Sequence, residues 1–145
     1  MSRSATDGRI DRQAVAVGAV LGSALSVSFG ALGWWLAHRS HDPGDGATGA
    51  SLTDAAAVVA GGGLGLVVGC AVAAARSRLG RPLADGFAAA VVGTVVSLSV
   101  LLVATEEDFV LVDYLGVVAV FGIPLLAAGW LGANLGRDFR RGRVR

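Results

Sequence analysis

The 145-residue chain contains no lysine, one cysteine and few charged residues, which make up 16% of the sequence. The single cysteine, Cys70, cannot build a disulfide scaffold. The arginines flank apolar runs instead of forming the basic soluble surface of a nucleic-acid-binding module. Apolar residues make up 54% of the chain, which is too many for a disordered protein. With a mean hydropathy of +0.66, the composition indicates a membrane protein.

Four stretches of the sequence contain no charged residue and are 20 to 25 residues long. At about 1.5 Å of rise per residue, a helix of this length crosses the roughly 30 Å hydrocarbon core of a bilayer. The runs lack the alternating pattern of a membrane β-barrel, and only helices otherwise satisfy the backbone in lipid. We therefore predict one all-α membrane domain, an up-down bundle of four transmembrane helices at 13–37, 55–75, 86–105 and 114–136.

The placement of arginine predicts how the bundle is oriented. Eleven of the twelve arginines lie in residues 1–12, in the connection 76–85 or in residues 137–145, and only Arg39 lies on the other side. By the positive-inside rule, both termini and the middle connection are expected in the cytoplasm. Arginine without lysine, in an Ala/Gly/Val-rich chain, indicates a GC-rich prokaryote. We therefore expect a multi-pass protein of a prokaryotic cytoplasmic membrane.

Small residues recur every four positions in the first two predicted helices. In lipid, helices associate by close backbone approach through such small residues. The pattern predicts packing of the first helix against the second, with an oligomer interface or a pore lining as the alternative. The residues concerned are Gly18, Gly22, Ser26 and Gly30 in the first helix, and Gly61, Gly65 and Gly69 in the second.

Few polar side chains lie within the four runs. Ser26 and Ser97 lie at similar depth, so hydrogen bonding between hydroxyls could bring the first and third helices together. Pro124 removes one backbone hydrogen bond from the fourth helix and predicts a kink. Small multidrug exporters have a similar length and helix number, but they depend on a glutamate in the first helix. No acid lies within 13–37, which excludes that family.

A short polar motif follows the first predicted helix. His38, His41 and Asp42 form the pattern H-x-x-H-D, in which two imidazoles and a carboxylate could hold a transition metal. Two histidines and a loop acid are also common by chance, and the pattern specifies no fourth ligand. An exposed helix end is therefore the favoured interpretation, and no metal site is predicted.

Acidic residues gather in the connection between the third and fourth predicted helices. Glu106 and Glu107 could attract cations at a pore mouth if the protein formed a ring of subunits. Asp113 could cap the fourth helix or face a vestibule. A solvated acidic loop and a helix cap are the favoured interpretations of these residues.

No family is recognised in the sequence, and it contains no nucleophile–base pair, phosphate-binding loop or pair of catalytic carboxylates. We therefore predict no enzymatic activity and no cofactor. The favoured function is that of a non-enzymatic packing or assembly partner in the cytoplasmic membrane. Its expected partners are the lipid bilayer and another membrane protein or a second copy of the chain, not nucleic acid. The alternative is a channel or transporter subunit that oligomerises through its glycine ridges.

Overall fold

The structure of the protein is a computed structural model that describes residues 10–39, 52–104, 116 and 118–142. Four of its helices are long and apolar enough to cross a membrane, and no strand occurs in the described residues. This confirms the prediction of an all-α protein with four candidate membrane spans. The elements are α1 (Arg12–Arg39), α2 (Leu52–Arg76), α3 (Pro82–Ala104), the π-helical turn η1 (Val118–Gly122) and α5 (Ile123–Gly142).

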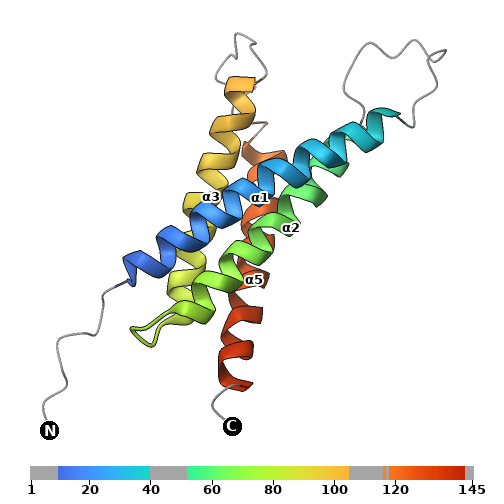
Figure 1. The fold of residues 1–145 in the computed structure, drawn as a ribbon. Coiled ribbons are helices and arrows are strands. Elements are labelled where there is room, and N and C mark those ends of the chain that lie inside the picture. Colours follow the sequence, from blue (N-terminus) through green and yellow to red (C-terminus); the bar gives the residue numbers. More distant parts are fainter. Residues whose placement is uncertain (1–9, 40–51, 105–115, 117, 143–145) are drawn as a thin grey trace, which may run out of the picture.

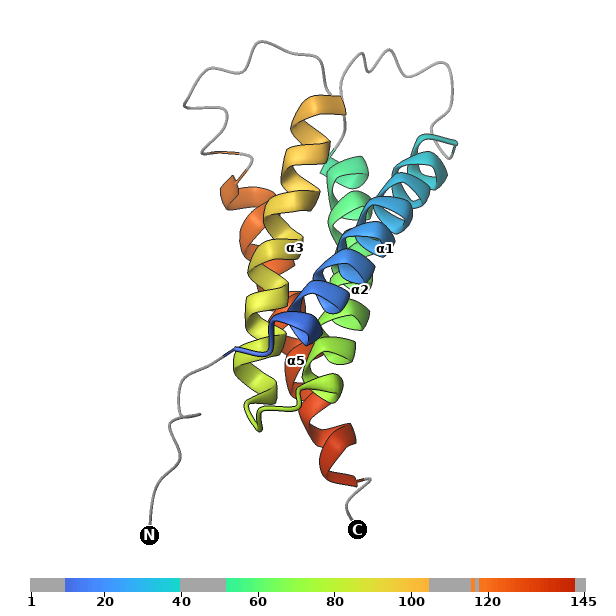
Figure 2. The same ribbon diagram turned by 60° about the vertical axis from the view of Figure 1, so that its left-hand side comes forward.

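Successive helices run in opposite directions (Figure 1). The beginning of α1 and the end of α5 lie at the same end of the bundle, which we call the termini end. The helices α2 and α3 each contact all three of the other long helices. Both α1 and α2 slant across α3 in Figure 1, and Figure 2 shows that α1 and α3 diverge away from the termini end.

The helices extend beyond the ranges expected from the apolar runs, most of all at the start of α3 and at the end of α5. The helix α3 begins at Pro82 rather than at residue 86, and α5 continues to Gly142 rather than ending at residue 136. Proline suits the first position of a helix because the N–H that it lacks has no partner there. The turn before it contains Gly80 at a φ of 79°, a conformation that favours glycine. Ending each expected helix at the nearest charged residue made the expected ranges too short.

The π-helical turn η1 precedes Pro124, the second residue of α5. Proline cannot donate a backbone hydrogen bond, and its ring crowds the carbonyl four residues earlier. Single π turns commonly mark such interruptions of the regular hydrogen-bond ladder. The interruption expected at Pro124 therefore coincides with a wider turn on its N-terminal side.

The core differs in composition between the two halves of the bundle. Near the termini end, small side chains pack together, namely Cys70, Ala73, Ala89 and Ala90. Farther from that end the core contains larger side chains, namely Leu66, Leu98 and Leu125, with Phe121 packed against them. Small side chains allow helices to approach closely, whereas large ones hold them apart. The cavity described below lies in the half with the larger side chains, whereas the glycine contacts between α1 and α2 continue through both halves.

Candidate functional site

The backbones of α1 and α2 touch at their glycines. A Cβ atom added to Gly18 would lie 2.7 Å from the carbonyl oxygen of Gly69. One added to Gly69 would lie 2.5 Å from both the carbonyl oxygen of Gly18 and the backbone nitrogen of Gly22. Backbone atoms cannot move aside as a flexible side chain can. Glycine is therefore required here, and the contact has the close backbone approach of small-residue helix pairs.

The structure brings the two predicted ridges together within one chain. Gly61 faces the backbone of Phe29 and Gly30, and Gly65 faces that of Ser26. Gly33 extends the same contact, since a Cβ atom there would lie 2.5 Å from the carbonyl oxygen of Ala57. The four-residue spacing predicted most of this interface. It did not predict Gly33, because Gly33 follows Gly30 by three residues rather than four.

A second feature, at the termini end, ties the start of α1 to the rest of the bundle. The backbone nitrogen of Asp11 donates to Oδ1 of Asp85 over 3.0 Å. The Asp11 carboxylate in turn accepts hydrogen bonds from the backbone nitrogens of Ala14, at 3.2 Å, and Arg78, at 2.9 Å. Asp11 is thus the N-cap of α1. Its pKa is lowered, chiefly by the hydrogen bond from Arg78 and then by that from Ala14.

The carboxyl group of Asp85 is fully buried, with 0% of the residue exposed. Its Oδ2 atom and the hydroxyl of Ser77 have no hydrogen-bond partner in the described part of the chain. The sequence analysis placed Asp85 in the connection 76–85, whereas it lies inside α3 and within a candidate membrane span. Pro82 followed three residues later by an acid is a signature of a helix start, and it would have identified this position.

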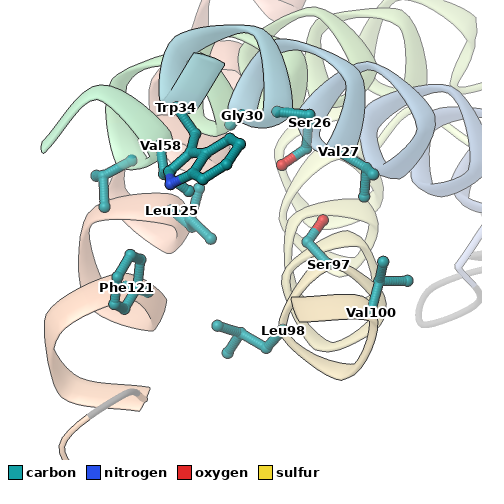
Figure 3. Close-up of a pocket in the computed structure, with 13 residues that line it drawn as sticks. Ser26, Val27, Gly30, Trp34, Val58, Ser97, Leu98, Val100, Phe121 and Leu125 are labelled. Carbon is teal, nitrogen blue, oxygen red and sulfur yellow. The ribbon is translucent and has the colours of Figure 1, made fainter. Parts of the chain in front are cut away.

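A cavity of about 480 Å³ lies in the half of the bundle away from the termini end. Residues from α1, α2, α3, η1 and α5 surround it, and Figure 3 shows the open space between their side chains. The lining is apolar apart from two hydroxyl groups and the indole nitrogen of Trp34. Six of the lining residues define its extent: Ser26, Trp34, Val58, Ser97, Phe121 and Leu125.

The two hydroxyls belong to Ser26 on α1 and Ser97 on α3, which the sequence predicted to lie at similar depth. They point toward one another from facing helices (Figure 3). Ser97 is only 8% exposed, and its Oγ atom has no hydrogen-bond partner among the described residues. The expected direct hydrogen bond between the two serines is therefore not formed, and both hydroxyls border the cavity instead.

Several residues singled out from the sequence cannot be placed. Glu106, Glu107 and Asp113 lie outside the described residues, as do His41 and Asp42. His38 falls within α1. In the described ranges, no group of three histidine, cysteine or acidic residues lies close enough together to hold a metal ion. The acidic loop, the helix cap and the exposed helix end expected at these positions remain predictions, with the pore mouth and the metal site as their alternatives.

Comparison with known proteins identifies no relative: no family model, curated protein or solved structure matches the chain. The function must therefore be argued from the three features described above. The glycine contact holds two helices together, and the hydrogen bonds of Asp11 with Asp85 and Arg78 fasten the start of α1. The cavity offers a buried hydrogen-bond donor in apolar surroundings. Of the three, only the cavity has space for another molecule.

Proposed function

We propose that this protein is a small, non-enzymatic, multi-pass protein of a prokaryotic cytoplasmic membrane that acts as a packing or assembly partner for another membrane protein. The observation that carries the proposal is the contact between the glycine ridges of α1 and α2. Because Gly18, Gly22 and Gly69 already face each other inside one chain, these ridges are not free to join subunits around a pore. A partner must therefore bind another face of the bundle.

The distribution of arginine along the helices supports a cytoplasmic location for both termini. The described arginines gather at the termini end, except for Arg39 at the far end of α1. Basic residues are retained on the cytoplasmic side during membrane insertion. The arginines at the termini end are Arg12, Arg76, Arg78, Arg81, Arg137, Arg140 and Arg141.

One face of α5 supplies a surface for the proposed partner. Leu131, Leu135 and Phe139 are exposed and recur every four residues, so they lie on the same side of the helix. Phe139 is 61% exposed and lies beyond Arg137, where the helix continues past its apolar part. An apolar stripe that continues among arginines fits a helix of a partner membrane protein better than lipid alone.

Photo-crosslinking in cells tests this proposal. A photoreactive amino acid at Leu135 is expected to give one discrete adduct with a second membrane protein. The matched control is Val20, which is exposed on α1 and lies outside the α5 face; this position is expected to give no such adduct. An adduct of twice the monomer mass would identify a second copy as the partner. The absence of any adduct at Leu135 would contradict the assembly role.

Ion flux distinguishes the alternative function, a channel subunit. The protein reconstituted into liposomes is expected to pass cations no faster than empty liposomes do. Cation flux that disappears when Glu106 and Glu107 are changed to glutamine would replace the assembly role with a pore.

A further inference from the structure

The cavity between α1 and α3 is open on one side and is lined by residues of all four long helices and of η1. At about 480 Å³, this cavity lies within the range of roughly 300 to 1,000 Å³ that is typical of sites for small molecules. Trp34, Phe121 and Leu125 stand around the space, so a flat ring could contact aromatic and aliphatic side chains on several sides (Figure 3).

The lining of the cavity selects for an uncharged molecule. None of the described residues that line it carries a charged side chain. Burying a charge without an opposite partner is strongly unfavourable in such surroundings. An ion or a charged lipid headgroup is therefore a poor occupant, whereas a neutral apolar molecule fits.

The hydroxyl of Ser97 specifies one polar feature of that molecule. Other serines in these helices donate to the carbonyl oxygen four residues earlier, as Ser23 does over 2.7 Å, and Ser28 and Ser99 over 2.8 Å. The Oγ atom of Ser97 forms no such bond, although the residue is more than nine-tenths buried. A hydroxyl can donate to any acceptor within reach. A carbonyl oxygen in the cavity would satisfy it.

The route into the cavity leads through the side of the bundle. Val27, Trp34 and Val100 line the cavity and are also exposed on the outer surface. They belong to α1 and α3, the helices that diverge away from the termini end (Figure 2). Both helices are apolar enough to cross a membrane, so the opening would face lipid. A molecule dissolved in the bilayer could then enter sideways.

We infer that the cavity is a binding site for a neutral, lipid-soluble carbonyl compound of the quinone type. The ring of the compound packs against Trp34 and Phe121. One of the carbonyl oxygens on that ring accepts hydrogen bonds from the hydroxyl groups of Ser97 and Ser26. The apolar tail leaves through the opening between α1 and α3. Binding does not require the protein partner proposed above, so each idea can fail without the other.

Tryptophan fluorescence of the purified protein in detergent, titrated with decylubiquinone, tests this inference. Quinones quench indole fluorescence at close range, so saturable quenching is expected and should be largely lost in Trp34→Phe. Ser97→Ala is expected to raise the Kd about tenfold through loss of one buried hydrogen bond. The matched control is Ser99→Ala, because Ser99 is exposed and donates to Val95 of its own helix; its Kd is expected to be unchanged.

A second ligand and a second variant complete the test. Decylbenzene, which has the tail and a ring but no oxygen, is expected to displace decylubiquinone only at about tenfold higher concentration or more. Ser26→Ala is expected to weaken binding in the same direction as Ser97→Ala, and it replaces that variant if Ser97→Ala does not fold. Absence of saturable quenching, or equal competition by decylbenzene, would overturn the inference. The second result would identify the occupant as a plain lipid chain.

Discussion

The same helices pack differently in the two halves of the bundle. Near the termini end, backbones meet directly, as at Gly18 and Gly69, and small alanines fill the remaining space. In the other half, α1 keeps its contact with α2 through Gly33 and Ala57 but moves away from α3, and a cavity opens. Close packing along α1–α2 thus coexists with a gap between α1 and α3.

The difference shows where the helices pack backbone against backbone and where they leave open space. Glycine contacts continue along the length of α1 and α2, so this hairpin is one packed unit. The cavity lies where α1 separates from α3, while Leu66 of the hairpin still packs with Leu98 of α3 and Leu125 of α5. Space for a ligand therefore comes from the angle between α1 and α3, and the close packing of α1 against α2 is preserved.

The largest loss of unfolding free energy is expected from a bulky substitution in the close-packed half near the termini end. Gly69→Leu would force a side chain against the backbone of Gly18 and Gly22, so the hairpin must separate. We expect a loss of about 3 kcal/mol or more in unfolding free energy, at the upper end for overpacked cores. Thermal unfolding in detergent measures it. The control Gly142→Leu, at a glycine with no atom within 4 Å of the added Cβ, should unfold as the wild type does.

The next largest loss of stability is expected from removing a hydrogen bond at the termini end without adding a larger side chain. Asp85→Ala removes the acceptor for the backbone N–H of Asp11, leaving a part-buried donor unpaired. The expected cost is about 1–3 kcal/mol. Asp85→Asn keeps a carbonyl oxygen and should cost less. Hydrogen exchange at the first turn of α1 reports the change directly, and equal exchange in Asp85→Ala and the wild type would contradict it.

A smaller effect is expected at a glycine beside the cavity. A Cβ atom at Gly62 would meet only side-chain atoms closely, namely Oγ of Ser26 at 3.1 Å and Cδ2 of Leu125 at 3.3 Å. These atoms can move into the cavity. Gly62→Ala should therefore leave the unfolding temperature unchanged or slightly raised, since alanine favours a helix by about 1 kcal/mol. Gly65→Ala, one turn along the same helix but facing backbone, should lower it clearly.

The smallest effect on stability is expected from protonation of the Asp11 side chain, which caps α1, at low pH. The fold lowers the pKa of Asp11 below its ordinary value of 3.8, so the ionised form stabilises the folded state. This contribution is complete above about pH 4 and is lost as the pH falls through the lowered pKa. The wild type should unfold at a higher temperature than Asp11→Asn at pH 6, and this difference should shrink as the pH is lowered through the pKa of Asp11. A constant difference across this range would exclude the ionised cap.

The sequence predicted the helices and the glycine contact because both depend on local patterns. Apolar length identifies a membrane span, and four-residue spacing identifies a helix face. It did not predict the burial of Asp85, because a search for uncharged runs ends a helix at its first charge. The cavity was also missed, because the angle between α1 and α3 depends on contacts between residues far apart in the chain.

The hydrogen bonds of Asp11 have a consequence for the order in which the protein is made. Two of its three partners, Arg78 and Asp85, follow it in the chain by 67 and 74 residues. During synthesis the first helix therefore emerges, and can enter the membrane, before its cap is complete. The start of α1 becomes fastened only after the α2–α3 turn has left the ribosome. Arg78 in the α2–α3 turn and Asp85 in α3 thus hold the start of α1 in place. In a chain truncated before Arg78, the first turn of α1 would lack both hydrogen bonds.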